Sequence, residues 1–218
     1  MSRLLCCLLM LLALPACSCS STESPVQPLS DRELTIQTLA ANHLDSQGDH
    51  PHFGRGMFDR TLQQLKAIPN STAAVRYDLN RTIGERGLFI GENLRSSEAY
   101  AEALKLLPEV AGMDGQESSL LLDLAVAWLR VGETENCIHC QNCESCLFPI
   151  SAAAVHQQRK GSEEAIVYLN ILLEKEPDHI IARWLLNIAH MTLGHPQDAI
   201  AEQFRLPPSA LASDGSFP

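Results

Sequence analysis

Apolar residues recur along this chain at intervals of three and four, the spacing that places them on one face of an α-helix. The first such stretch covers residues 31–44, and Ser30 before it is a suitable N-cap. A second helix is expected over about residues 53–68, and Ser71 after it is the expected cap of a third. Strict alternation of apolar and polar residues with hairpin turns is not found. The pattern predicts an all-α fold.

Small and apolar residues also repeat over a longer distance from about residue 77 onward. They resemble the tetratricopeptide (TPR) pattern, in which a small residue lets two helices approach, a glycine opens the turn and a proline ends the second helix. Matching positions are Ile83, Gly84, Gly91, Ala103, Pro108, Leu124, Ala125, Trp128, Gly132, Ala165, Pro177, Leu186 and Gly194. The repeat predicts a TPR-like solenoid of antiparallel helix hairpins over residues 31–206, with a Pro/Ser-rich tail at 207–218. It also places Cys137 and Ala199 in second helices.

An insert at residues 133–160 interrupts this repeat. Half of the eight cysteines of the chain lie within it, in the array C-x2-C-x2-C-x2-C formed by Cys137, Cys140, Cys143 and Cys146. Four thiols this close together are typical of a disulfide framework in an exported protein and of a metal or redox site in the cytosol. The compartment therefore decides what the array means.

The N-terminus indicates export. Arg3 precedes an apolar run of 11 residues, which is too short to cross a bilayer and fits a signal peptide over residues 1–17. Leu14-Pro15-Ala16-Cys17 resembles a bacterial lipoprotein box, so we expect Cys17 to be lipidated; secretion with cleavage near Ala16 is the alternative. Residues 18–30 are expected to be a flexible tether. Both alternatives lead to the periplasm or cell envelope, with a lipid anchor in the membrane in the first.

Four chemistries fit the array in such a compartment. Disulfide staples come first because the leader implies an oxidising environment. Four thiolates at two-residue gaps also suit zinc or another soft metal, with His139 and His156 as substitute ligands. An iron–sulfur cluster and catalytic thiol–disulfide exchange remain as further alternatives. A c-type haem is excluded, because Gln141 and not histidine follows Cys140.

Composition and motifs exclude other functions. The formal net charge is −10 and no basic run occurs, which argues against a nucleic-acid surface. No G-x-S-x-G, G-x4-G-K-[ST] or H-E-x-x-H motif is present. We therefore expect a protein that is not an enzyme and needs no cofactor, with zinc as the alternative if the array binds a metal.

The segment from Gly132 to Pro208 carries a family resemblance. Its stretches GETENC, ESCLFPI, GSEEAI and ARWLLNIAHMTLG are similar to the TPR-bearing N-terminal region of exported bacterial proteins that continue into FG-GAP/VCBS propeller repeats and an ASPIC/UnbV domain, a set related to cartilage acidic proteins. The resemblance favours a Cys137–Cys146 disulfide, which would close a ten-residue loop worth roughly 2–3 kcal/mol. The sequence stops at Pro218 without a propeller repeat, so the activities of the missing domains are not carried over.

Two functions follow from these patterns. In the first, the chain is a scaffold or interaction module that binds a protein or peptide on the concave face of a solenoid. The repeat phase places four polar residues on that face, namely Arg81, Glu85, Arg130 and Thr192. In the second, the chain is an exported metal-binding or thiol-redox protein, and the solenoid displays the cysteine insert.

Overall fold

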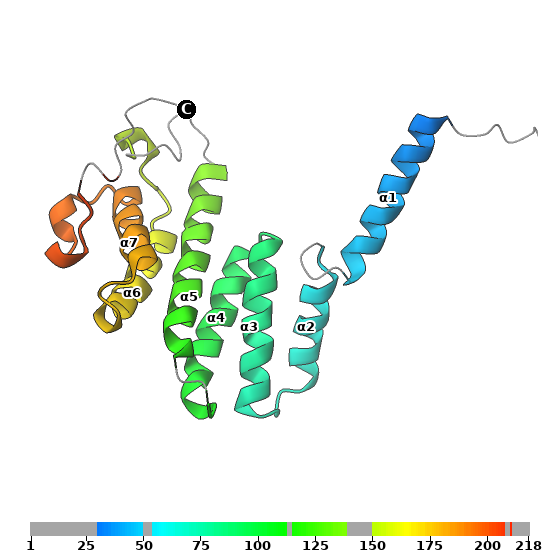
Figure 1. Cartoon of the computed structure of the whole chain (residues 1–218), viewed down its shortest axis with the longest axis horizontal. Helices are drawn as coiled ribbons and strands as arrows, with labels where there is room; N and C mark the ends of the chain where they lie inside the picture. Colours follow the sequence, from blue (N-terminus) through cyan, green and yellow to red (C-terminus); the bar gives the residue numbers. More distant parts are fainter. Residues whose placement is uncertain (1–29, 50–53, 113–114, 139–149, 208–209, 211–218) are drawn as a thin grey trace, which may run out of the picture. The chain divides into compact units, whose positions relative to one another are not determined.

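The computed structural model describes residues 30–49, 54–112, 115–138, 150–207 and 210 of the chain. Within these residues it contains seven α-helices and no strand (Figure 1), so the prediction of an all-α fold is confirmed for the described part of the chain. None of the described helices has the length and apolar character needed to span a membrane. The chain divides into two compact units, Met1–Ala40 and Ala41–Pro218.

Helix α1 (Asp31–Asp49) begins with a capping box and contains the division between the two units. The Glu33 backbone N–H donates to the Ser30 hydroxyl at 3.4 Å, and the Glu33 carboxylate accepts from the Ser30 N–H at 2.9 Å. This confirms Ser30 as the cap. The apolar stripe expected on α1 is exposed at three positions: Leu34, Ile36 and Leu39 are 54–63% exposed.

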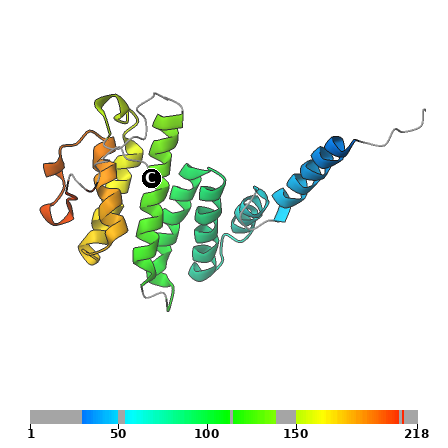
Figure 2. The same ribbon diagram turned by 45° about the horizontal axis from the view of Figure 1, so that its top comes forward.

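The second unit contains α2 (Gly56–Ala67), α3 (Ala73–Phe89), α4 (Asn93–Leu106), α5 (Gln116–Glu133), α6 (Lys160–Lys175) and α7 (Ile180–Thr192). From α2 to α7, each helix packs against its neighbours along the chain, and Figures 1 and 2 show α3, α4 and α5 side by side from two directions. The turn between α3 and α4 is short, and Gly91 adopts a φ of +79° there, which favours glycine. This short turn lets α4 run back along α3 in the opposite direction.

Small residues allow the closest contacts between these helices. A Cβ on Gly161 at the start of α6 would lie 2.5 Å from the Gly132 backbone nitrogen and 2.7 Å from the Trp128 carbonyl oxygen of α5. A Cβ on Gly84 of α3 would lie 2.7 Å from the Tyr100 ring of α4. Leucines fill the remaining space, and those no more than 1% exposed are Leu120, Leu121, Leu124, Leu169, Leu172, Leu173 and Leu186.

Three local predictions are corrected by the structure. Thr72 rather than Ser71 caps α3, because its hydroxyl is the one that accepts from the Val75 N–H. Cys137 lies in a π-helical turn, Thr134–Ile138, that continues α5, and not in a separate second helix. Ala199 lies in a short 3-10 turn, Gln197–Ala199, and not in an α-helix.

Candidate functional site

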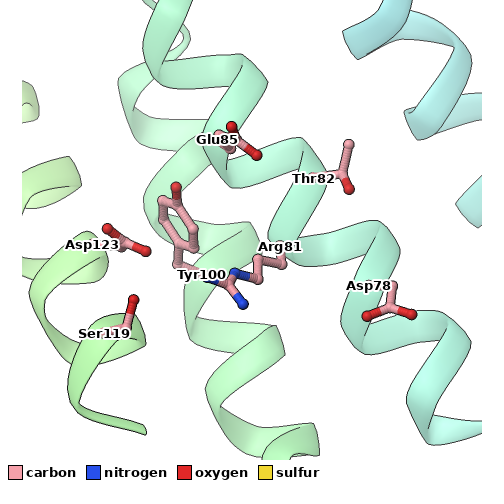
Figure 3. Close-up of a pocket in the computed structure, with 7 residues that line it drawn as sticks. All are labelled: Asp78, Arg81, Thr82, Glu85, Tyr100, Ser119 and Asp123. Atoms are coloured by element: carbon pink, nitrogen blue, oxygen red, sulfur yellow. The ribbon is translucent and has the colours of Figure 1, made fainter. Parts of the chain in front are cut away.

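A hollow of about 570 Å³ lies over α3, α4 and α5 (Figure 3). Four of its lining side chains come from α3, where intervals of three and four residues place them on one helical face: Asp78, Arg81, Thr82 and Glu85. Tyr100 of α4 and both Ser119 and Asp123 of α5 complete the lining. The hollow is therefore built from consecutive helices and lined mainly by polar groups.

Carboxylates outnumber cations in this hollow. Asp78, Glu85 and Asp123 contribute three negative charges, and Arg81 contributes one positive charge, leaving a formal charge of −2. The Arg81 guanidinium donates to the Gln116 side-chain oxygen at 2.8 Å, and no salt bridge joins it to a carboxylate of the described residues. The negative charge of the hollow is thus only partly balanced from within.

Tyr100 is the most buried of the described lining residues, with an exposed fraction of 3%. Its ring packs against Gly84, whose lack of a side chain gives the ring its place. Burial raises the pKa of the Tyr100 hydroxyl, and the charges of Asp123 and Glu85 raise it further. The hydroxyl therefore stays protonated and neutral beside two carboxylates.

Asp123 occupies an unfavourable position for an ionised side chain. Burial raises the pKa of its carboxyl, Glu85 adds to that rise, and Arg81 partly opposes it. In the sequence, Asp123 interrupts the apolar stretch LLLDLAVAW of α5, and a charged residue within such a stretch is a signal by which this position could be found. Tyr100 carried no comparable signal, because a tyrosine on a helix is usually a packing residue.

The four residues expected on a concave face lie in two places. Arg81 and Glu85 line the hollow of α3, α4 and α5. Arg130 and Thr192 line another hollow, of about 380 Å³, which is bordered by α5, α7 and the described ends of the insert. Arg130 pairs with Glu133, and the buried Thr192 hydroxyl donates to the Ala189 carbonyl at 2.8 Å. Only the first pair of residues therefore belongs to the polar hollow.

The second hollow contains an ordered chain of side-chain contacts. The Cys137 sulfur lies 3.8 Å from His156 Nε2, and His156 Nδ1 lies 3.2 Å from the Ser162 hydroxyl. Ser162 in turn lies 2.8 Å from the Thr192 hydroxyl. Because Thr192 donates its proton to a backbone carbonyl, Ser162 donates to Thr192 and accepts from His156 Nδ1. His156 therefore presents the lone pair of Nε2 to the sulfur of Cys137.

Burial keeps this histidine neutral. It lowers the pKa of His156, and the nearby charge of Glu133 opposes the shift. Next to it, Asn136 joins the two ends of the insert: its side-chain N–H₂ donates to the Gln158 carbonyl at 2.9 Å, and its side-chain oxygen accepts from the Gln158 N–H at 2.8 Å. Hydrogen bonds thus hold both ends of the insert near Cys137 and His156.

The remaining predicted residues, Cys17, His139, Cys140, Cys143 and Cys146, lie outside the described residues. Among the residues that are described, no group of three or more histidine, cysteine, aspartate or glutamate side chains could hold a metal ion. The lipid anchor, the disulfides and the zinc alternative therefore stay predictions.

Comparison with known proteins adds no assignment. No family model matches the chain, and no significant match is found among curated proteins or solved structures. The resemblance to TPR-bearing exported proteins therefore stays a hypothesis that comes from the sequence.

Proposed function

We propose that this chain is a non-enzymatic, TPR-like interaction module of an exported, lipid-anchored protein, and that it binds a protein or peptide segment in the hollow of α3, α4 and α5. The observation that carries the proposal is this hollow. Its volume of about 570 Å³ falls in the range of binding pockets, and three consecutive helices supply its lining. Arg81 and Glu85, which the repeat phase assigns to a concave face, are both among its lining residues.

The helix contacts support the TPR-like part of the proposal. In that repeat, small residues let the two helices of a hairpin approach each other. Gly84 against Tyr100 serves this role between α3 and α4, and Gly161 against Gly132 serves it between α5 and α6. Stacked hairpins of this kind display a binding face formed by the first helix of each pair.

Filling the hollow with a large side chain tests the proposal. Peptides are selected from an unbiased library on the wild-type chain, and their affinities are then measured for Ser119→Trp and for Val167→Trp. Ser119 is exposed and lines the hollow, whereas Val167 is an exposed residue of α6 outside it. We expect Ser119→Trp to weaken binding by at least about tenfold and Val167→Trp to leave it unchanged. Selected peptides that bind the plugged variant as well as wild type would contradict the proposal.

The contact between Cys137 and His156 favours a second candidate function, metal binding or thiol–disulfide exchange at the cysteine insert. A histidine nitrogen facing a cysteine sulfur is common to zinc sites and to reactive thiols. Counting thiols and metal per chain in protein purified from the cell envelope separates the candidates. Two disulfides without metal favour the interaction module, and one bound metal with titratable thiols favours the second function.

A further inference from the structure

We propose that the group bound in the hollow of α3, α4 and α5 is a cationic side chain, an arginine of the bound peptide segment. This inference rests on the proposed function and specifies the chemistry of its partner. Three features of the hollow carry it: its uncompensated negative charge, a tyrosine that is 3% exposed and whose hydroxyl has no hydrogen-bond partner in the described structure, and the distribution of its acceptor oxygens over three helices.

The charge comes first. Asp78, Glu85 and Asp123 face the hollow with Arg81 as the one cation of its lining, and the hydrogen bond that Arg81 donates goes to the neutral amide of Gln116. A second cation entering the hollow would reduce the formal charge of −2 to −1. It would also relieve the mutual repulsion of Glu85 and Asp123, which adds to the rise that burial causes in the pKa of the Asp123 carboxyl.

Tyr100 provides, through its hydroxyl, an observation that is independent of the charge of the hollow. Its side chain is 97% buried, yet none of the hydrogen bonds within the described part of the chain involves its hydroxyl, and the rise of its pKa comes from burial and charge alone. Figure 3 shows the hydroxyl pointing into the hollow between Glu85 and Asp123. The phenol oxygen is therefore an acceptor that a donor entering the hollow can reach.

The arrangement of acceptors favours a guanidinium. Carboxylate oxygens of α3 and α5 lie on either side of the phenol oxygen of α4, so a ligand must donate in several directions at once. Arginine carries five N–H donors in one plane and stays charged at every physiological pH, whereas lysine presents one compact ammonium group. The hollow is also larger than one side chain, which leaves space for the flanking peptide backbone.

The experiment is an NMR titration of the ¹⁵N-labelled full chain with three short peptides, acetyl-Ala-Arg-Ala-amide and its citrulline and glutamate analogues. Citrulline has nearly the shape of arginine but no charge. We expect the arginine peptide to shift amide signals of α3, α4 and α5 around the hollow, and the two analogues to leave them in place. Equal shifts with the citrulline or glutamate peptide would overturn the inference.

Variants locate the effect. Asp123→Asn should weaken the arginine peptide about fivefold, and Tyr100→Phe, which keeps the ring on Gly84, about threefold. Glu174→Gln removes the same charge as Asp123→Asn from an exposed position of α6 outside the hollow, and should change affinity by less than about a factor of two. Equal losses in Glu174→Gln and Asp123→Asn would assign the binding to the net charge of the chain and overturn the inference.

Two further outcomes separate this inference from the proposed function. If library-selected peptides without arginine are blocked by Ser119→Trp, the hollow is a peptide site and the arginine assignment is wrong. If spermidine shifts the same amides at concentrations well below those needed for the arginine peptide, the hollow binds a free polyamine and the peptide assignment is wrong. Both proposals are supported together if arginine-containing peptides bind the hollow, their citrulline analogues do not, and Ser119→Trp blocks the binding.

Discussion

At the scale of single residues, Asp123 is a side chain whose charge opposes folding. Burial raises the pKa of its carboxyl above the ordinary value of 3.8. The folded chain therefore holds this proton more tightly than the unfolded chain does. The stabilising contribution is fully present below pH 3.8 and is lost as the pH rises through the folded pKa.

Removing the charge of Asp123 should therefore stabilise the protein at neutral pH. We expect Asp123→Asn to raise the free energy of unfolding at pH 7 and to have a smaller effect at pH 3.5, where the wild-type carboxyl is largely protonated. Urea titrations at the two pH values measure the difference, with Glu174→Gln as the control. A destabilised Asp123→Asn variant would mean that the carboxylate has a structural role instead.

Two neighbouring glycines should respond in opposite ways to the same substitution. A methyl group on Gly161 would lie against backbone atoms of α5, so Gly161→Ala must push α5 and α6 apart, and we expect a loss of about 1–3 kcal/mol. A methyl group on Gly132 would lie 3.5 Å from its nearest neighbours, which is an ordinary contact. Gly132→Ala should therefore be neutral or gain up to about 1 kcal/mol from helix propensity. Thermal or urea unfolding of the pair checks this, and equal effects would contradict the close approach of the two helices.

At the scale of elements, the start of α3 shows which of two adjacent hydroxyls caps the helix. The Thr72 hydroxyl accepts from the Val75 N–H, whereas the Ser71 hydroxyl is buried without a hydrogen-bond partner in the described structure. We expect Thr72→Ala to lower the free energy of unfolding by about 1 kcal/mol. Ser71→Ala should be neutral or slightly stabilising, because it removes an unsatisfied group. The reverse order in urea unfolding would restore Ser71 as the cap.

Contacts between elements also hold the two ends of the insert. The cysteine array predicts disulfides in that role, and the described residues add hydrogen bonds: Asn136 pairs with Gln158, and the His156 N–H donates to the Thr192 carbonyl at 2.8 Å. These contacts connect the π-helical turn after α5 with the segment before α6, and that segment with the last residue of α7. The ends of the insert therefore have partners in the helical unit that do not depend on the cysteines.

At the scale of the whole molecule, buried histidines make stability depend on pH. Burial lowers the pKa of His156 and of His190 below the ordinary value of 6.5, with Glu133 opposing the shift at His156 and the charge of His195 adding to it at His190. For a depressed histidine pKa, the stabilising contribution is present above pH 6.5 and is lost as the pH falls through the folded pKa.

We therefore expect the melting temperature to decrease as the pH is lowered from about 7.5 to 5. His156→Gln should reduce this dependence, and His43→Gln, a change at an exposed histidine, should preserve it. Thermal unfolding followed by circular dichroism over this pH range tests the expectation. A His156→Gln variant with the full wild-type pH dependence would show that this histidine does not contribute.

The sequence by itself indicated which segments are helical, the cap of α1 and the close approach of α3 and α4 at Gly84. Periodic apolar residues, Ser30 before α1 and Gly84 occupy positions of a local pattern, so their roles can be inferred from spacing. Cys137 and Ala199 were misplaced because α5 continues into a π-helical turn and only a short 3-10 turn forms at Gln197–Ala199.

Only the tertiary structure decided which polar residues meet. Tyr100 and Asp123 join Glu85 in one hollow although they belong to three helices, and Arg130 and Thr192 lie in another. It also brought Cys137 to within 3.8 Å of His156 and buried the Thr192 hydroxyl. The physical reason is that helical periodicity defines the face a residue occupies on its own helix, whereas the position and crossing angle of the neighbouring helix depend on side-chain packing along the whole contact.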